Sequence, residues 1–375
     1  MHPEKENDMS IKQLVINPGS TSTKLAVFED DRQVLERSLS HPAEELKQFA
    51  DLYDQVPYRL EAIRGFLRDN GLKPSDFDVI MCRGGMVWGI GMGGFKVNEA
   101  LAETLRNEEY TSPHASNLGG IMGRILAEEG GIDAYIYDAV TAASLPKFAA
   151  VTGFPEIVRR SSCHVLNMHA MAEQYAADHG LDYASQKLLI VHMGGGISYC
   201  AMDHGQIIDS IGDDDGPFSP ERAGFTQILP IVKMCYSGDY SYAEMKQKIR
   251  GNGGFKAYFG TSSMRDIEKM VDEGNEKAIL VYDAEAYQIS KGICELTVAF
   301  KGDVDAIILT GGLAYSERLT AKISEYVKFI APIYIYPGEN EMLALARGGV
   351  RIMNGTERAK EFRLEDIIEA NRPIV

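Results

Sequence analysis

The chain begins with a pattern of apolar and polar positions that predicts a β-hairpin. Residues 14–16 are apolar, Pro18-Gly19 interrupts this run, and apolar residues recur over 24–28. Two such runs around a Pro-Gly turn are typical of antiparallel strands. The turn region gathers short hydrogen-bonding side chains and one cation, namely Asn17, Ser20, Thr21, Ser22, Thr23 and Lys24. These groups suit an anionic ligand such as phosphate, although serine and threonine also favour turns for local reasons.

The same order of strand, glycine turn, strand, polar turn and strand appears twice. The first copy occupies 11–39, and the second occupies 188–211 with Gly194, Gly195 and Gly196 at its first turn. A polar residue closes the first strand of each copy, Asn17 in one and His192 in the other. We interpret this pattern as an internal duplication. Two copies that face each other would bring both hairpin tips to one cleft, a common place for a ligand.

Helical and strand patterns alternate in the rest of the chain. Apolar residues recur at helical spacing over 44–70, 118–129, 165–179 and 278–300. Short apolar runs predict strands at 79–81, 134–137, 306–310 and 333–336. We therefore predict an α/β protein with mixed sheets covered by helices. Its predicted parts are an N-terminal lobe over 11–152, a C-terminal lobe over 153–340, and helices over 341–375 that pack back on the N-terminal lobe.

Several charged residues stand beside turns or at the ends of predicted strands. Arg83 opens a glycine-rich loop, and Arg222 lies in the turn-rich stretch 216–224. Each guanidinium offers paired donors for a carboxylate or a phosphoryl group, although most arginines simply lie on the surface. Asp138 ends a predicted strand, where α/β folds keep their sites. His164 follows two arginines and precedes a predicted helix.

The composition limits the partners and the location. Of 375 residues, 45% are hydrophobic, so the chain can bury a sizeable core and should form about two domains. The formal net charge of −16 argues against nucleic-acid and anionic-membrane partners, because both need basic surfaces. The five cysteines are scattered without a C-x-x-C pair, which indicates reduced thiols and a cytoplasmic protein rather than a zinc site. No apolar run is long enough to span a membrane.

Eight short motifs follow one another along nearly the whole chain, namely Asn17-Pro-Gly-Ser-Thr-Ser-Thr-Lys24, Arg83-Gly-Gly85, Tyr137-Asp138, Arg159-Arg-Ser-Ser-Cys-His164, His192-Met-Gly-Gly-Gly196, Glu221-Arg-Ala-Gly224, Thr310-Gly-Gly312 and Pro337-Gly-Glu-Asn-Glu341. Each motif is weak by itself, but their order resembles the acetokinase family of the actin, sugar kinase and Hsp70 superfold, and within it the butyrate kinases. The resemblance implies two duplicated ribonuclease-H-like (actin-like ATPase) lobes around a central nucleotide cleft. It also implies that the C-terminal lobe binds the nucleotide, ATP or ADP.

The resemblance implies roles for the charged residues. Arg83 lies by the acyl substrate and Arg222 by the transferring phosphoryl group. His164 donates a hydrogen bond to the oxygen that develops charge, and His192 belongs to the phosphate region; both could instead be satisfied core histidines.

Two carboxylates are assigned to the metal rather than to proton transfer. A carboxylic acid substrate has a pKa of roughly 4 to 5 and needs no general base at neutral pH. We therefore assign Asp138 to Mg²⁺ or its waters. Glu341 resembles the magnesium-side carboxylate of the family, although an acidic residue at a helix N-terminus needs no metal.

The resemblance also implies a nucleotide site. Its phosphate-binding residues are Asn17, Ser20, Ser22, Lys24, His192, Gly194, Gly195 and Gly196. Adenine is expected near Gly311, Gly312, Met264 and Arg265. Ser263-Met264-Arg265 stands where acetate kinases tend to have Asp-Phe-Arg, so stacking would come from a thioether. Where acetate kinases read Arg-Val-Val-His-Gly-Gly, this chain has Arg83-Gly84-Gly85-Met86, and the glycines are expected to make room for a longer acyl chain.

These inferences lead to one preferred function and two alternatives. We expect reversible phosphoryl transfer between ATP and a short-chain carboxylate, with butyrate as the favoured acid and Mg²⁺ required. An acetate or propionate kinase is the alternative within the same class. A non-catalytic, ATP-dependent switch of the actin-like superfold is the alternative from another class, but it has no use for Arg83, His164 and Arg222 together. The family also suggests a homo-oligomer, a dimer or larger.

Overall fold

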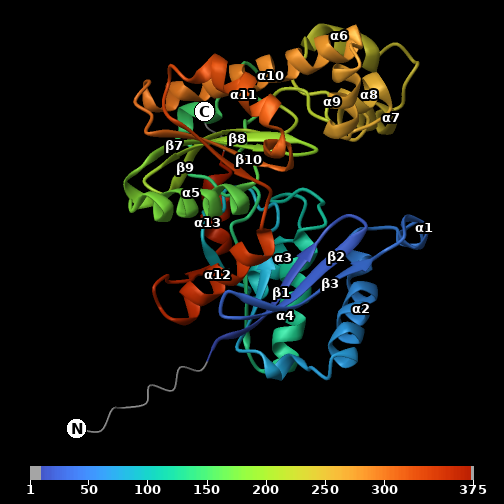
Figure 1. Cartoon of the computed structure of the whole chain (residues 1–375). Coiled ribbons are helices and arrows are strands. Elements are labelled where there is room, and N and C mark those ends of the chain that lie inside the picture. Colours follow the sequence, from blue (N-terminus) through green and yellow to red (C-terminus); the bar gives the residue numbers. More distant parts are fainter. Residues whose placement is uncertain (1–9, 373–375) are drawn as a thin grey trace. The chain divides into compact units, whose positions relative to one another are not determined.

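The computed structural model describes residues 10–372, which divide into two compact units (Figure 1). The first unit contains the described residues up to Ala142 and those from Asn340 onward, and the second unit contains Ala143–Glu339. The sequence placed the lobe boundaries at residues 152 and 340. The C-terminal segment therefore belongs to the same unit as the first hairpin.

A seven-stranded mixed sheet forms the centre of the first unit, in the order β12-β5-β6-β4-β1-β2-β3. Its strands are β1 (Lys12–Pro18), β2 (Ser22–Glu29), β3 (Arg32–Ser40), β4 (Val79–Arg83), β5 (Gly94–Lys96), β6 (Asp133–Tyr137) and β12 (Lys360–Glu361). β1 and β2 form the predicted hairpin, and β4 lies parallel to β1 on its other side. Because parallel strands end at the same edge of a sheet, Asn17 on β1 and Arg83 on β4 lie at one edge.

The helices of the first unit are α1 (Ala43–Leu46), α2 (Val56–Asp69), α3 (Glu99–Thr104), α4 (Asn117–Gly130), α12 (Glu341–Met353) and α13 (Leu364–Ala370). α4 packs against β4 and β6, and α12 packs against β1 and β4. The return of α12 to the two strands that carry Asn17 and Arg83 brings the last predicted motif of the chain to the first one.

The helix predicted over 44–70 is shorter in the structure. α2 begins at Val56, and residues 47–52 form no helix. Pro57 accounts for this start, because proline has no backbone N–H to donate and is favoured in the first turn of a helix. The predicted end is confirmed, since Asn70 caps the helix and Gly71 follows with a φ of +64°.

The second unit repeats the strand order of the first. Its five-stranded sheet has the order β11-β10-β7-β8-β9. The strands are β7 (Lys187–Met193), β8 (Ile197–Asp203), β9 (Gln206–Ile211), β10 (Ala306–Gly311) and β11 (Ile333–Pro337). β7, β8 and β9 form an antiparallel meander as β1, β2 and β3 do, and β10 lies parallel to β7 as β4 does to β1. In both meanders the register between the second and third strands shifts once. The predicted duplicated α/β fold is confirmed.

Helices cover both faces of the second sheet. The helices of the second unit are α5 (Val165–His179), α6 (Ile228–Cys235), α7 (Tyr242–Ile249), α8 (Gly254–Phe259), α9 (Met264–Asp272), α10 (Glu276–Leu296) and α11 (Glu317–Val327), of which α10 and α5 cover the two faces of its sheet. α10 packs against β7, β8 and β9, while α5 packs against β7 and β10 on the opposite face (Figure 1). None of the described helices in either unit is long and apolar enough to cross a membrane.

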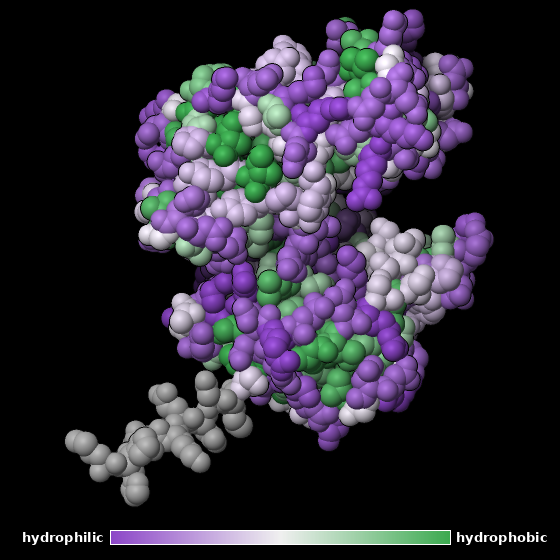
Figure 2. Space-filling model, in the orientation of Figure 1, coloured by the Kyte–Doolittle hydropathy of each residue, from purple (hydrophilic) through white to green (hydrophobic). Residues whose placement is uncertain are grey.

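α6 is the exception to the rule that apolar helices are buried. It is mostly apolar, yet none of its residues is buried, and Leu229 is 80% exposed. Its apolar side chains form a hydrophobic patch at the upper right of Figure 2, where hydrophilic residues cover most of the surrounding surface. Patches of this kind often mark contact surfaces.

The core of the second unit contains one carboxylate without a partner. Glu285 lies on the buried face of α10 with Tyr282 and Ile289, and it is fully buried. Neither of its carboxylate oxygens accepts a hydrogen bond from the described residues. Burial raises the pKa of Glu285 well above the usual value of 4.5, so the side chain is held in its neutral form at the expense of stability.

We expect Glu285→Met to stabilise the protein by about 1–3 kcal/mol, because methionine fills a similar volume without an unsatisfied polar group. The folded state binds a proton that the unfolded state releases above pH 4.5, so the stability of the wild type falls as the pH rises from that value towards the raised pKa. The advantage of the variant should therefore grow over the same range. Thermal unfolding at several pH values measures it, with the exposed Glu295→Gln of the same helix as control. Equal stability of Glu285→Met and wild type at every pH would contradict the expectation.

Candidate active site

Three residues far apart in the sequence meet at the edge of the first sheet. The Arg83 guanidinium lies against the Glu341 carboxylate, with Nη1 donating to Oε2 at 3.0 Å and Nη2 lying 3.0 Å from Oε1. The Asn17 side-chain amide donates to Oε2 of Glu341 at 2.7 Å. The strands β1 and β4 supply Asn17 and Arg83, and Glu341 is the first residue of α12. The structure thus places the predicted acyl-side arginine and the predicted metal-side carboxylate in direct contact.

This contact bears on the predicted Mg²⁺ site. A single carboxylate fits the one or two that Mg²⁺ usually takes together with phosphate oxygens and waters. Both oxygens of Glu341, however, already face Arg83, so a metal ion bound there would compete with the guanidinium. Within residues 10–372, no three metal-ligating side chains gather into a site that could hold an ion. Protein ligands for Mg²⁺ would therefore be few, and the metal role of Glu341 stays a prediction.

Asp138 holds the glycine-rich loop that follows Arg83. It directly follows β6, has a φ of +43° and is 2% exposed. One carboxylate oxygen, Oδ1, accepts a hydrogen bond of 2.8 Å from the backbone N–H of Gly93. A non-glycine residue with positive φ is uncommon and is often found at functional sites. The arrangement favours a role in fixing the loop, while the predicted metal role of Asp138 stays untested.

Gly84 and Gly85 do not leave open space within the first unit, contrary to the expectation from the sequence. A Cβ atom on Gly84 would lie 2.5 Å from the Cα of Ala139. A Cβ atom on Gly85 would lie 2.4 Å from Cδ2 of Leu105 and 2.7 Å from Oδ1 of Asn117. These glycines allow close packing of the loop against neighbouring elements. The expectation that their missing side chains make room for a longer acyl chain is therefore wrong.

The tip of the first hairpin exposes some of its polar side chains and buries others. Ser20 and Lys24 are exposed and Ser22 is half-buried, whereas Asn17 is buried at the end of β1. The turn is closed by a hydrogen bond of 2.7 Å from the N–H of Gly19 to the carbonyl of Ser22. Lys24 follows the alternation of the strand and projects on the side opposite to buried Thr23.

In the second unit, the two predicted histidines lie against each other. The rings of His164 and His192 stack with centroids 3.8 Å apart and planes at 9°. Nδ1 of His164 is 2.7 Å from the Ser198 hydroxyl, and Nδ1 of His192 is 3.0 Å from the amide nitrogen of Asn167. Because that amide nitrogen can only donate, Nδ1 of His192 accepts, and a neutral ring then carries its proton on Nε2. Glu339 lies 3.6 Å from this Nε2.

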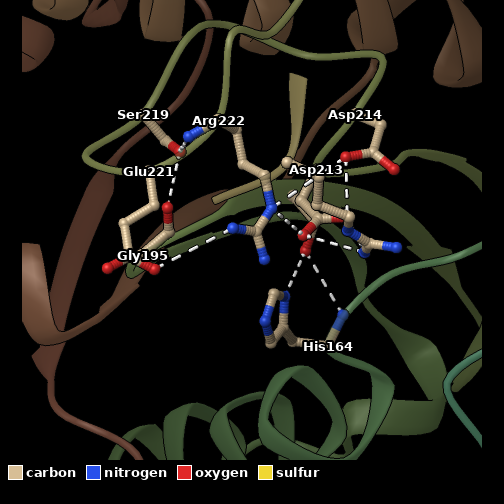
Figure 3. A network of polar contacts seen from close by, with 9 residues as sticks. His164, Gly195, Asp213, Asp214, Ser219, Glu221 and Arg222 are labelled. Carbon is tan, nitrogen blue, oxygen red and sulfur yellow. Dashed lines mark hydrogen bonds and ion pairs between the residues drawn. The ribbon is translucent and has the colours of Figure 1, made fainter. Parts of the chain in front are cut away.

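The second hairpin tip is bound to the loop that carries Arg222. The Ser219 hydroxyl and the Glu221 N–H both donate to the carbonyl of Gly195, at 2.6 and 3.1 Å. The Ser219 hydroxyl also accepts from the Arg222 N–H at 3.2 Å. Figure 3 shows the Arg222 guanidinium above His164, with Gly195 and Glu221 on one side and Asp213 on the other. The structure therefore brings Arg222, His164 and the glycine tip together, while their predicted roles stay predictions.

Two residues that the sequence analysis did not single out hold Arg222 in place. Asp213 accepts from Nε of Arg222 at 3.2 Å and from Nη2 of Arg250 at 3.1 Å. The chain around Arg250 runs antiparallel to that around Arg222, and the Ala223 N–H donates to the carbonyl of Ile249. Nε is engaged by Asp213, and Nη1 makes a long ion pair of 3.9 Å with Oε2 of Glu221, so a phosphoryl group bound by the Nη groups would replace only that long contact. The run Asp213-Asp214-Asp215 just before the arginine was the available signal in the sequence.

Asp214 adds a second carboxylate to this cluster. It lies 3.4 Å from Nε of Arg250 and 3.9 Å from Nε of Arg222. Burial, and then the neighbouring Asp213 carboxylate, raise the pKa of Asp214. The guanidinium groups of Arg250 and Arg222 lower this pKa and oppose the shift, so positive and negative charges lie side by side in this cluster.

The residues predicted to lie near adenine differ in how tightly they are packed. Gly311 has a φ of +88°, and a Cβ there would lie 2.4 Å from the carbonyl of Met193, so only glycine fits between β10 and β7. Gly312 has open space where a side chain would be. Met264 is half-buried and packs partly against the core of the second unit, whereas Arg265 is exposed. A stacking role for Met264 stays a prediction.

Comparisons with known proteins show the family of the chain. The model of the acetokinase family matches residues 137–350. The chain is 44% identical to a protein named probable butyrate kinase 2 from Caldanaerobacter subterraneus subsp. tengcongensis, over 94% of this chain and 99% of that protein. It is 42% identical to butyrate kinase 2 of Clostridium acetobutylicum, over 95% of this chain and 100% of that protein.

Solved structures show the same fold at lower sequence identity. The acetate kinase of Porphyromonas gingivalis superimposes with a TM-score of 0.76 at 17% identity, covering 92% of this chain and 100% of that one. A propionate kinase from Francisella tularensis gives a TM-score of 0.72 at 16% identity, covering 90% of this chain and 98% of that one. At such identities the likeness concerns the fold alone.

Proposed function

The chain belongs to the acetokinase family and is a carboxylate phosphotransferase, and we propose that it transfers the γ-phosphoryl group of ATP reversibly to butyrate, giving butyryl phosphate and ADP. The observation that carries the proposal is the placement of the Arg222 guanidinium, held by Asp213, beside His164 and the glycine tip of the second hairpin. The names of the relatives at 42–44% identity over nearly the whole chain support butyrate as the acid.

The chemistry requires positive charge rather than a base. The attacking carboxylate is already ionised at neutral pH and has no proton to give up. One of its oxygens forms a bond to the γ-phosphorus while the bond from that phosphorus to the β-γ bridging oxygen breaks, and ADP leaves with the electron pair. Both reactants are anionic, so the enzyme supplies alignment and charge stabilisation.

We assign a distinct part of this task to each cationic or donor group. Arg222 stabilises the transferring phosphoryl group through its Nη groups. His164 donates a hydrogen bond to a phosphoryl oxygen. Arg83 binds the substrate carboxylate, which takes over part of the contact between Glu341 and the guanidinium. Ser20, Ser22 and Lys24 of the first unit, and Gly194, Gly195 and Gly196 of the second, are assigned to the phosphates of the nucleotide.

The proposal has three further parts. Mg²⁺ neutralises charge on the β- and γ-phosphates when bound, with Glu341 as the protein carboxylate on its side. The protein works in the cytoplasm, in keeping with its scattered cysteines. It forms a homo-oligomer, as the family resemblance suggests.

Trapping of acyl phosphate by hydroxylamine tests the function. With saturating MgATP and a series of C2 to C6 acids, we expect hydroxamate from several acids and the highest kcat/KM with butyrate. Each methylene should change kcat/KM by about 10-fold to 200-fold where the pocket discriminates. Reactions without nucleotide serve as the control. A maximum at acetate or propionate would replace the proposed acid, and absence of hydroxamate with every acid would overturn the proposed reaction.

A further inference from the structure

A fully buried arginine lies behind the tip of the first hairpin. Arg59 belongs to α2 and has 0% of its surface exposed. Its Nη1 donates to the carbonyls of Gly19 and Ser22 at 2.9 and 3.1 Å, and its Nη2 donates to the carbonyl of Ser20 at 2.8 Å. Nε and Nη2 also donate to the side-chain oxygen of Gln55, at 3.1 and 2.9 Å. One guanidinium thus binds the carbonyls of three residues of the hairpin turn.

The partners of Arg59 are all neutral. They are backbone carbonyls, the Gln55 amide and the Thr23 hydroxyl, which lies 3.3 Å from Nη1. No carboxylate among residues 10–372 lies within 4.0 Å of the guanidinium nitrogens of Arg59. Burial lowers the pKa of the guanidinium, yet this group remains protonated in proteins. A buried cation is usually paired with an anion, because an unpaired charge in the interior is costly.

His41 does not add a second charge beside Arg59. Its Nε2 lies 2.8 Å from the Thr23 hydroxyl, and burial followed by the charge of Arg59 lowers the pKa of His41 to about 4. The ring is therefore neutral at pH 7. The Thr23 hydroxyl can accept from Arg59 and donate to the histidine, so a single positive charge stands behind the turn.

The hydrogen bonds also remove the negative ends of the peptide dipoles from the tip. The carbonyls of Gly19, Ser20 and Ser22 are bound by Arg59, and the carbonyl of Thr21 accepts from the N–H of His41 at 2.8 Å. A turn whose carbonyls are bound from the interior, three by Arg59 and one by the His41 N–H, offers an anion its exposed hydroxyls without opposing oxygens. The interior also screens the charge less than water does.

We propose that Arg59 is the positioning residue and the buried counter-charge of the first hairpin, and that the anion whose charge it balances is the terminal phosphate group of the bound nucleotide. This inference rests on the proposed function, because it takes the hairpin as part of the phosphate site. It explains how a protein with a net charge of −16 makes this tip favourable for a polyanion.

Binding of ATP and AMP by calorimetry to the full-length protein tests the inference. For Arg59→Gln we expect the affinity for ATP to fall by about tenfold or more, since charge-assisted interactions are lost, while the affinity for AMP changes less than about twofold. Arg59→Lys keeps the charge and should retain more of the ATP affinity than Arg59→Gln. Arg68→Gln, on the exposed face of the same helix, is the matched control and should bind both nucleotides as the wild type does.

Each outcome decides the matter. The proposal would be overturned if Arg59→Gln lost equal affinity for ATP and AMP, or if the Lys and Gln variants lost equal affinity for ATP. Arg59 would then only stabilise the conformation of the turn. Unchanged ATP affinity in Arg59→Gln would also overturn the proposal. If Arg59→Gln does not fold, Arg59→Lys decides by the same ratio of ATP to AMP affinity. A wild type that binds ATP but yields no hydroxamate would overturn the proposed reaction and leave this comparison intact.

Discussion

Replacement of Arg222 by alanine should lower kcat by about 10³-fold, because the charge that builds up on the transferring phosphoryl group loses its guanidinium. The KM values for both substrates should change far less, since the interaction strengthens in the transition state. The structure supports this expectation by fixing Nε of Arg222 on Asp213 and leaving the Nη groups beside His164. Steady-state kinetics with butyrate and MgATP, read by hydroxamate formation, measure it.

A lysine at position 222 separates charge from geometry. Lysine keeps the charge but cannot donate to Asp213 and to the phosphoryl group through one planar fork. We therefore expect Arg222→Lys to recover only a small part of the lost rate. Arg318→Gln is the matched control, because Arg318 forms an exposed ion pair with Asp272 in the same unit. A kcat of Arg222→Ala within tenfold of wild type would remove this residue from the chemical step.

The second large effect is expected at Arg83. In Arg83→Gln the KM for the carboxylate should rise by about 10²-fold, because two charge-assisted hydrogen bonds to the substrate are replaced by weaker ones. The KM for MgATP should stay within about twofold. Kinetics with each substrate varied in turn distinguish the two effects. A rise in the nucleotide KM alone would place Arg83 on the phosphate side instead.

The pairing of Arg83 with Glu341 gives this prediction an internal control. The single variant leaves a mostly buried carboxylate without its cation, which should cost about 1–3 kcal/mol of unfolding free energy. The double variant Arg83→Gln/Glu341→Gln should recover that stability without recovering the carboxylate affinity. Arg64→Gln, which breaks a surface pair with Glu129 in the same unit, should affect neither quantity strongly. Recovery of affinity in the double variant would contradict a direct role of Arg83 in binding.

The hairpins and the duplication could be predicted because they are written in short stretches of sequence. Alternating apolar residues and a glycine turn define β1 and β2, and the same pattern defines β7 and β8. The single helix expected over 44–70 was wrong in being continuous, because residues 47–52 form no helix between α1 and α2, and apolar spacing alone does not show where a helix begins. The expected space at Gly84 and Gly85 was wrong because a missing side chain says nothing about which neighbour fills its place.

Some residues of the candidate site could likewise be recognised in the sequence, and others could not. Arg83, His164 and Arg222 stood out because their side-chain chemistry suits phosphoryl transfer. Their partners did not stand out: Asp213 and Arg250 resemble ordinary surface charges in the sequence, and Arg59 resembles any polar residue of an amphipathic helix. The sequence also gives no sign that Glu285 lacks a partner. Its carboxylate destabilises the protein only when α10 packs and buries it.

The sequence by itself determined the strands, the glycine turns, the repeat and the residue types that the reaction needs, because these depend on backbone periodicity and on the chemistry of single side chains. Only the tertiary structure decided which charge faces which. The contact of Arg83 with Glu341 bridges 258 positions, and it exists because β4 and α12 pack together. The first hairpin shows the same division. Its hydroxyls and Lys24 can be read from the sequence, whereas the buried cation behind them is Arg59, which belongs to α2 and reaches the turn only in the folded protein.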